Sequence, residues 1–282
     1  MKLKKKVNFD VCTFCNHQCT FCSNPDNRTI KSKVSLDDFN KVMNNITKYL
    51  EIEEIGLSAK GEVLINKDLP SIIKSVKQNY NIGYTYISSN GALATKEKMD
   101  YLIQCGLDST KFSINAVDKT TYLNVHKKDD FEIVIENLKD LLLLKKEKYP
   151  EHKVFISSVI DLKEDTLHKK FKKILGEELF SLINGISVYE ISYTAKFEEI
   201  KKDQKVTKKC PIPFNEIYIN SDSTLGLCCK DYFDEINFGS LLEKDFLEVY
   251  NGTYFKDIRN MHKTSEFPDN HICKNCLLFG DN

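Results

Sequence analysis

Four cysteines lie within eleven residues near the start of the chain, and their spacing restricts its fold more than any other feature. The last three, Cys15, Cys19 and Cys22, follow the pattern C-x3-C-x2-C. This spacing supplies three thiolates to a [4Fe-4S] cluster, whereas sequences that ligate every iron normally carry a fourth cysteine at a defined offset. One iron is therefore left with an open coordination position. The pattern predicts that a small molecule binds there and that this loop is the reactive centre.

A four-cysteine structural zinc site is the alternative use of the same residues. Cys12 with Cys15, and Cys19 with Cys22, form two C-x2-C pairs. Only three residues separate the pairs, and zinc normally needs a longer connection, so the spacing favours the iron–sulfur cluster. Disulfides are not expected, because no apolar signal segment follows the lysine-rich start and ten cysteines in a reducing compartment indicate metal or redox chemistry. His17 is expected to be a satisfied or exposed imidazole.

The composition excludes several classes of partner. Lysine and arginine (41) balance aspartate and glutamate (41), so neither nucleic acid nor a charged membrane surface is expected to bind. The longest apolar run, residues 141–144, is far too short to span a bilayer. We therefore expect a cytoplasmic protein with a core large enough for one domain of barrel size and a small appendage.

From residue 5 to about residue 195, short β-rich segments alternate with amphipathic helical segments. The predicted strands are residues 7–11, 54–58, 83–88, 111–115, 154–160 and 186–192, and the predicted helices begin after Ser35 and cover residues 69–80, 95–105, 131–148 and 165–175. Six β–α repeats imply parallel strands with right-handed crossovers. Such units form a barrel or an open sheet, and both place their chemistry at the carboxyl ends of the strands.

The sequence changes character after this region. The lysine-rich residues 196–209 have little apolar periodicity and predict a linker. Residues 216–220 and 225–229 predict a hairpin with Asp222 and Ser223 at its turn, and two short helices are expected near residues 242–250 and 253–261. The predicted domains are residues 1–195, the linker 196–209, and residues 210–282.

The first cysteine motif directly follows the first predicted strand, and here the chain resembles the radical S-adenosylmethionine (SAM) superfamily. The family signature C-x3-C-x-aromatic-C is met by Cys15, Cys19, Phe21 and Cys22. The resemblance implies a partial (β/α)6 TIM-like barrel whose open iron binds the amino and carboxylate groups of SAM. It also implies that reductive cleavage of SAM yields a 5'-deoxyadenosyl radical, and that a one-electron donor such as flavodoxin or ferredoxin is a partner.

The resemblance continues at the ends of the following strands and implies further SAM contacts. Lys60-Gly61-Glu62 stands where the family carries Gly-Gly-Glu, with a lysine in place of the first glycine. Ser88-Ser89-Asn90-Gly91 is similar to the family's Thr-Asn-Gly. The implied contacts are Phe21, Gly61, Glu62, Ser88, Ser89, Asn90, Ser113, and Lys127 or Lys128. Taken singly, each is more often a turn residue, a satisfied hydroxyl or a solvated charge, but their coincidence at successive strand ends favours the cofactor site.

The C-terminal region carries a second set of cysteines. Cys210, Cys228 or Cys229, Cys273 and Cys276 can complete four-coordination around zinc or an iron–sulfur cluster. The region resembles the shortened SPASM module, or twitch domain, which implies a small α+β iron–sulfur domain with one fully ligated auxiliary [4Fe-4S] cluster that moves electrons. We prefer Cys228 as the ligand, because adjacent side chains of a strand face opposite ways. Cys229 is then the candidate hydrogen donor.

The predicted function is dehydrogenation of a hydroxyl-bearing small molecule of sugar or aminocyclitol type, with the electron passed to the auxiliary cluster. In its length and its compact C-terminal region, the chain resembles the aminocyclitol dehydrogenases that oxidise 2-deoxy-scyllo-inosamine. A radical SAM epimerase of a sugar or cyclitol, with Cys229 or Cys105 as thiol donor, is one alternative. A radical SAM maturase of a ribosomal peptide is another, and a non-catalytic module with two zinc sites is a third.

Overall fold

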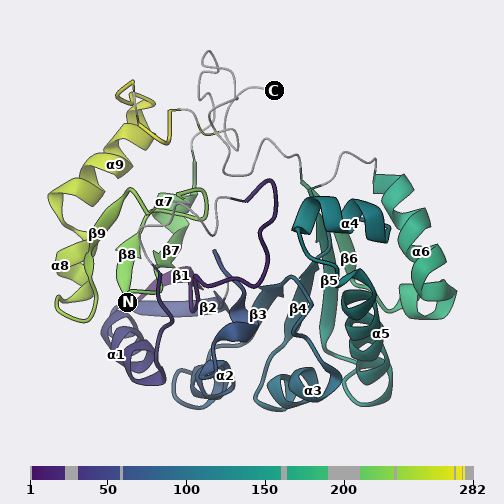
Figure 1. The fold of residues 1–282 in the computed structure, drawn as a ribbon. Coiled ribbons are helices and arrows are strands. Elements are labelled where there is room, and N and C mark those ends of the chain that lie inside the picture. Colours follow the sequence, from purple (N-terminus) through teal and green to yellow (C-terminus); the bar gives the residue numbers. More distant parts are fainter. Residues whose placement is uncertain are drawn as a thin grey trace.

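One sheet of nine strands organises the described part of the chain, and helices cover one of its faces (Figure 1). The computed structural model describes residues 2–22, 31–57, 60–159, 164–189, 210–231, 234–269, 271–274 and 276. The strands lie in the spatial order β6-β5-β4-β3-β2-β1-β7-β8-β9. The first six therefore follow one another across the sheet, as expected when each β–α unit adds its strand on the same side.

The first six strands and their crossover helices confirm the predicted partial barrel. The strands are β1 (Leu3–Phe9), β2 (Leu50–Gly56), β3 (Tyr84–Ser89), β4 (Ser109–Ser113), β5 (Lys153–Ser158) and β6 (Gly185–Val188), all paired in parallel. The helices are α1 (Leu36–Ile46), α2 (Leu69–Gln78), α3 (Lys96–Gln104), α5 (Phe131–Glu147) and α6 (Glu164–Ser181), and a 3-10 turn, η1 (Val63–Ile65), follows β2. Ser35 caps α1 as predicted, because its Oγ accepts a hydrogen bond from the Asp38 amide at 3.1 Å.

The strands present an apolar face to the helices and a polar face to the interior of the open barrel. On β1, Val7 and Phe9 are buried, and Phe9 packs on Phe39 of α1 with ring centroids 5.0 Å apart. The alternate residue Asn8 faces the other way and donates a hydrogen bond to Glu216 at 3.0 Å. β1 begins at Leu3 rather than at residue 7, because its lysine-rich first residues pair with β2 although they lack apolar alternation.

The sequence analysis missed helix α4 (Lys119–His126), which lies between β4 and α5. Asp118 caps it and accepts a hydrogen bond from the Thr121 amide at 2.8 Å. Only Tyr122 and His126 of this helix are buried. Two buried positions are too few to give a clear helical period, so the hydrophobic pattern does not reveal this helix.

The C-terminal region continues the barrel sheet. Its elements are α7 (Ile212–Asn215), β7 (Glu216–Ile219), β8 (Thr224–Gly226), β9 (Asn237–Ser240), α8 (Phe246–Tyr250) and α9 (Thr253–Thr264). β7 pairs in parallel with β1, and β7 and β8 form the predicted hairpin, with Ser223 in the left-handed region at φ 66°. The predicted linker, residues 196–209, lies outside the described residues.

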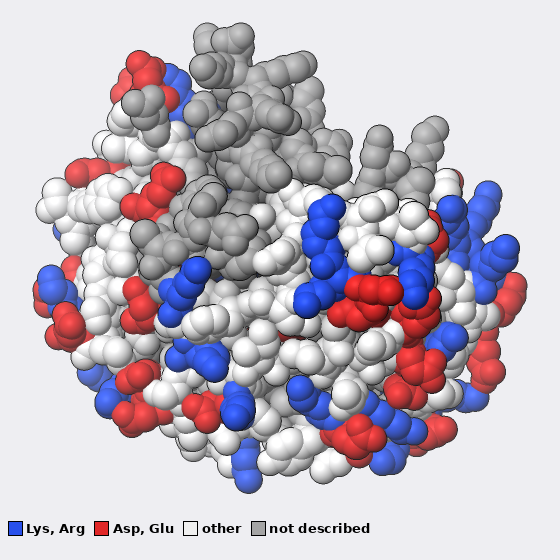
Figure 2. Space-filling model, viewed as in Figure 1, with Lys and Arg blue, Asp and Glu red and all other residues white. Residues whose placement is uncertain are grey.

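Charges are mixed over the surface. On the face in Figure 2, acidic and basic side chains of the described residues are interspersed, which agrees with the balanced composition. No helix in the described ranges has both the length and the apolar character needed to cross a bilayer.

A buried ion pair joins the barrel to the C-terminal region. The Lys60 ammonium pairs with the Asp234 carboxylate and donates a second hydrogen bond to Asn220 Oδ1 at 3.1 Å. Both side chains of the ion pair are 2% exposed. The sequence analysis aligned Lys60 with the first glycine of a Gly-Gly-Glu segment, and the buried ion pair gives this lysine a structural role.

We expect Lys60→Met to lower the free energy of unfolding by roughly 3–5 kcal/mol, because the Asp234 carboxylate stays buried without its partner. The measurement is the urea midpoint of the purified protein. Lys4→Met is the matched control, since the Lys4–Glu51 pair is exposed (65% and 58%) and should contribute at most about 1 kcal/mol. The double variant Lys60→Met/Asp234→Leu should recover most of the lost free energy of unfolding. If the double variant is as unstable as Lys60→Met, the role of the ion pair is contradicted.

Candidate active site

The loop after β1 carries the first cysteine motif to the carboxyl edge of the sheet, where the sequence analysis expected it. Cys15, Cys19 and Cys22 are partly exposed, whereas Cys12 is buried. Thr13 anchors the loop, because its amide donates to the Ser32 carbonyl at 3.1 Å and its Oγ1 accepts from the Ser32 amide at 2.9 Å. The three cysteines of the motif thus project from a loop whose backbone is tied to neighbouring segments.

The donor chemistry of the three cysteines fits an iron–sulfur cluster. Burial raises the pKa of Cys15 to about 11, and the charge of Cys22 contributes to this shift. Burial also raises the pKa of Cys19, with Cys22 and Cys15 as the next causes, so the three thiols are mutual neighbours. Protonated thiols in such a site become thiolates when a metal binds, and thiolates are the ligands that clusters require.

Cys12 lies in a different environment. Its thiol is directed at the Phe14 carbonyl oxygen at 3.6 Å, and its backbone forms an isolated bridge with Lys33. Burial raises its pKa to about 11, the charges of Asp10 and Glu62 add to the rise, and the Phe14 carbonyl contact and the charge of Lys33 oppose it. This environment gives no support to a zinc knuckle built from Cys12 and Cys15.

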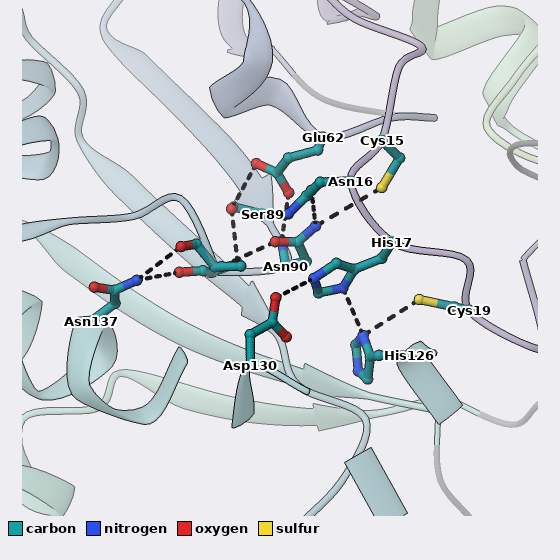
Figure 3. A network of polar contacts seen from close by, with 12 residues as sticks. Cys15, Asn16, His17, Cys19, Glu62, Ser89, Asn90, His126, Asp130 and Asn137 are labelled. Carbon is teal, nitrogen blue, oxygen red and sulfur yellow. Dashed lines mark hydrogen bonds and ion pairs between the residues drawn. The ribbon is translucent and has the colours of Figure 1, made fainter. Parts of the chain in front are cut away.

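Glu62 lies beneath the cysteine loop and is held by the end of β3. Its Oε1 accepts hydrogen bonds from the Leu64 amide at 3.0 Å and Ser89 Oγ at 2.8 Å, and its Oε2 accepts one from the Asn90 amide at 2.8 Å (Figure 3). Burial raises its pKa, and these hydrogen bonds partly offset the shift. The structure therefore brings together three residues that the sequence analysis assigned to SAM, and their contact with SAM stays a prediction.

Asn90 ties the β3 loop directly to the cysteine motif. Its Nδ2 donates to Asn16 Oδ1 at 2.8 Å and lies 3.9 Å from the Cys15 sulfur (Figure 3). Its Oδ1 accepts from the Ala92 amide at 3.0 Å, which fixes the orientation of the side-chain amide. Asn90-Gly91 is therefore a β–α loop at the site, as predicted, rather than a hairpin turn.

Gly61 lies against the backbone of the cysteine loop. A Cβ atom at Gly61 would lie 2.2 Å from the Cys12 carbonyl oxygen and 2.7 Å from that of Phe14. The adjacent Glu62 amide donates to the Phe14 carbonyl at 2.8 Å. Only a residue without a side chain fits this approach, which gives Gly61 a clear physical role in shaping the loop.

Helix α4 supports the cysteine loop from the other side. The last carbonyl groups of a helix have no partner within it. In α4, the Val125 carbonyl accepts from the Thr20 amide at 2.9 Å, and the His126 carbonyl accepts from the Gln18 amide at 3.3 Å. The loop residues next to Cys19 are thus held by the end of a helix that the sequence analysis missed.

A buried polar chain runs from this helix to the loop. His17 Nε2 lies 3.1 Å from Asp130 Oδ2, and His17 Nδ1 lies 3.1 Å from His126 Nδ1 (Figure 3). The His126 Nδ1 atom lies 3.4 Å from the Cys19 sulfur. Burial lowers the pKa of both imidazoles, to about 3 for His126. His17 is satisfied, as expected, whereas His126 and Asp130 were not recognised because their contacts are long-range.

The other predicted SAM contacts take up less specific positions. Ser88 and Ser113 face the barrel interior, where Ser113 Oγ lies 3.4 Å from Ser157 Oγ. Lys127 ends α4 in the left-handed conformation and, like Lys128, is exposed. Phe21 is partly buried beside the third cysteine. Their roles stay predictions.

The C-terminal cysteines gather into a second group. Burial raises the pKa of Cys210 to about 12, with the charges of Cys276 and Cys229 as further causes. Burial also raises the pKa of Cys273, and Cys276 and Cys210 contribute. Burial raises the pKa of Cys228, and the charges of Cys229 and Cys273 add to this rise. These thiols fit a fully ligated cluster.

The reason given for preferring Cys228 over Cys229 is wrong. β8 ends at Gly226, so neither cysteine lies in a strand and the alternation of strand side chains does not apply. Both thiols have other cysteines of the group as neighbours. The choice of Cys228 as ligand therefore stays a prediction.

The charge of Cys229 is coupled to polar side chains of the barrel interior. Tyr86 on β3 donates a hydrogen bond to Asn8 Oδ1 at 3.0 Å, and Asn8 bridges to Glu216 on β7. Burial raises the pKa of Tyr86, and the charge of Cys229 is a further cause. Glu216 likewise contributes to the raised pKa of Cys229. The C-terminal thiols and the interior side chains thus form one electrostatic environment.

Comparison with known families agrees with this arrangement. The model of the radical SAM superfamily matches residues 10–187, and that of an iron–sulfur cluster-binding domain, SPASM, matches residues 210–277. The GTP 3',8-cyclase of Chlorobaculum tepidum is 26% identical over 136 residues, which are 48% of this chain and 40% of the cyclase. The chain therefore matches less than half of the length of that relative.

Solved structures share the fold over nearly the whole chain. BtrN in complex with AdoMet and 2-DOIA has a TM-score of 0.63 at 16% identity, and the match covers 98% of this chain and 94% of BtrN. Streptococcus suis SuiB bound to the precursor peptide SuiA has a TM-score of 0.66 at 14% identity, covering 99% of this chain and 71% of SuiB.

We expect Gly61→Ala to abolish the first cluster, because the added methyl group collides with the Cys12 carbonyl and displaces the cysteine loop. Iron should fall from about eight to about four atoms per chain, as only the C-terminal cluster remains. The measurement is iron content after anaerobic reconstitution. Gly83→Ala is the matched control, since nothing lies within 4 Å of a Cβ at that position. Equal iron content in both variants would refute the steric role of Gly61.

Proposed function

Because the chain belongs to the radical SAM superfamily, we propose that it is an oxidoreductase that dehydrogenates a small molecule with hydroxyl groups, of sugar or aminocyclitol type. As a member of this family it is an enzyme that uses SAM, a [4Fe-4S] cluster and a further iron–sulfur cluster in the C-terminal domain. Cys15, Cys19 and Cys22 would hold the first cluster. Cys210, Cys273, Cys276 and either Cys228 or Cys229 would hold the second.

When bound, these groups supply a 5'-deoxyadenosyl radical that takes a hydrogen atom from a carbinol carbon and an auxiliary cluster that accepts the remaining electron. A one-electron donor such as flavodoxin or ferredoxin would reduce the first cluster. The chain's own residues hold the cofactors and orient the substrate. The hydroxyl proton needs a base, and the polar groups of the barrel interior are the candidates.

The observation that carries the proposal is that β7 and β8, which lead into Cys228 and Cys229, extend the barrel sheet beside β1. Cys229 affects the pKa of Tyr86, whose hydroxyl lies in the Tyr86–Asn8–Glu216 chain. A cluster at these thiols would lie beside the barrel sheet, in a position suited to accept an electron from a substrate bound in the interior. The interior hydroxyl, amide and carboxyl groups also suit a polar substrate better than an apolar one.

The structure of BtrN, solved with AdoMet and 2-DOIA, also supports the proposed substrate class. The match with this chain covers 94% of BtrN. A longer structure such as SuiB, bound to a precursor peptide, is covered over 71%. The match therefore extends over more of the protein solved with a small molecule than of the one solved with a peptide.

The test is an anaerobic product screen with sugars and aminocyclitols, read by mass spectrometry. We expect a product that is lighter by two hydrogens, formed together with 5'-deoxyadenosine. Cys15→Ala should abolish both, because one thiolate of the radical-generating cluster is lost. Turnover of a peptide, or none of any hydroxylated small molecule, would overturn the proposed substrate class.

An epimerase is the second candidate, because the charge of Cys229 is coupled to the interior residue Tyr86 and a thiol at that place could return a hydrogen atom. Cys105 is less suited, since it ends α3 and packs against the core on the helical side of the sheet. An epimerase would leave the product mass unchanged in H2O and introduce solvent deuterium in D2O.

Comparison of Cys229→Ala with Cys228→Ala separates the candidates and identifies the ligand. If Cys228 is the ligand, Cys228→Ala should lower the iron content and Cys229→Ala should retain about eight irons. Under the proposed dehydrogenation, Cys229→Ala then still forms the product lighter by two hydrogens. Loss of deuterium incorporation in Cys229→Ala with full iron would instead establish epimerisation.

A further inference from the structure

The direction of every hydrogen bond in the buried chain beside Cys19 can be assigned from its two ends. At one end, the Asn115 amide lies 3.3 Å from His126 Nε2. A backbone N–H can only donate, so His126 Nε2 must be the acceptor. A neutral imidazole with an unprotonated Nε2 carries its proton on Nδ1. The His126 Nδ1–H group therefore points toward the cysteine loop.

The other end of the chain requires the same assignment. An ionised carboxylate can only accept, so Asp130 Oδ2 accepts from His17 Nε2–H at 3.1 Å. His17 Nδ1 is then an acceptor, and it lies 3.1 Å from His126 Nδ1. Both ends thus place the shared proton on His126 Nδ1, and no tautomer conflict arises along the chain.

The same His126 N–H also faces the Cys19 sulfur at 3.4 Å, so its proton is shared between the His17 ring and the thiol (Figure 3). The His126 ring is held in place by stacking on Tyr122, with ring centroids 4.1 Å apart and an interplanar angle of 11°. His17 and His126 are 2% and 1% exposed, so water does not compete for this contact.

We propose that His126 is a positioning residue that donates an N–H···S hydrogen bond to the Cys19 thiolate and thereby makes the first cluster easier to reduce. The inference rests on the proposed role of Cys19 as a cluster ligand. Hydrogen bonds to ligating sulfurs stabilise the extra negative charge of the reduced state and raise the reduction potential. Asp130 and His17 hold the donor in the productive tautomer.

The test is a redox titration of the cluster-loaded protein with dithionite, followed by electron paramagnetic resonance. The signal that changes on adding SAM identifies the first cluster. In His126→Phe, which keeps an aromatic ring on Tyr122, the equilibrium constant for reduction should fall about tenfold, or about 59 mV for one electron. His126→Gln, which can still donate a hydrogen bond, should recover part of the shift.

His152→Phe is the matched control. His152 is another buried histidine, 3% exposed, and it is bonded to Thr110 and the Leu107 carbonyl. Its replacement should leave the potential unchanged. An unchanged potential in His126→Phe, or an equal shift in His152→Phe, would overturn the inference. A wild-type protein without iron would instead overturn the proposed function, so the two failures are distinguishable.

The ligand atoms of His17, Cys19 and His126 lie within 4.8 Å of one another, so a mononuclear metal ion is a competing use of the three residues. One zinc ion per chain that is lost in His126→Phe would overturn the inference.

If His126→Phe binds no cluster, its reduction potential has no cluster to report on. The hydrogen bond is then tested by electron paramagnetic resonance of wild-type protein with ¹⁵N-labelled histidine. A weak histidine hyperfine coupling to the reduced first cluster is expected, and its absence would refute the hydrogen bond.

Discussion

The close approach between Gly61 and the backbone of the cysteine loop is the constraint on which the rest of the site depends. It lets the Glu62 amide bond to the Phe14 carbonyl, and this places the buried Glu62 carboxylate under the loop. The carboxylate in turn accepts hydrogen bonds from Ser89 and Asn90 at the end of β3. One contact between two loops therefore sets the relative position of the cysteines and the predicted SAM contacts.

The same segment connects the site to the C-terminal region. Lys60, next to Gly61, is buried against Asp234 and Asn220, and β7 extends the barrel sheet beside β1. The first cysteine motif follows β1, and Cys228 and Cys229 follow β8, so both cysteine groups adjoin strands of one continuous sheet. The Lys60–Asp234 ion pair and the β1–β7 pairing thus connect the segments that carry the two cysteine groups.

Helix α4 contributes a second support that is independent of the Gly61 contact. Its carbonyl groups hold the loop amides, and its last residue, His126, reaches the Cys19 sulfur. The predicted cluster ligand Cys19 therefore contacts a buried network that ends on the Asp130 carboxylate. Such networks orient metal ligands and set the electronic properties of the metal they bind.

The sequence by itself determined what depends on local spacing. The pattern of Cys15, Cys19 and Cys22 fixes the ligand count, and the β–α periodicity predicts parallel strands with the site at their carboxyl ends. The family resemblance assigned Glu62 and Asn90 to the same predicted site, and the structure places the two residues in contact. The predictions of the parallel strands and of the shared position of Glu62 and Asn90 are confirmed, because they rest on a regular period and on short motifs at strand ends, whereas the number of cluster ligands stays a prediction.

Only the tertiary structure decided how distant residues meet. The contact of His126 with Cys19 spans 107 positions and that of Lys60 with Asp234 spans 174, and neither leaves a local pattern. Helix α4 buries too few residues to show a period, and β8 ends before Cys228, which removes the strand-based choice between Cys228 and Cys229. Long-range polar contacts depend on how the elements pack in three dimensions, and spacing along the chain does not encode that packing.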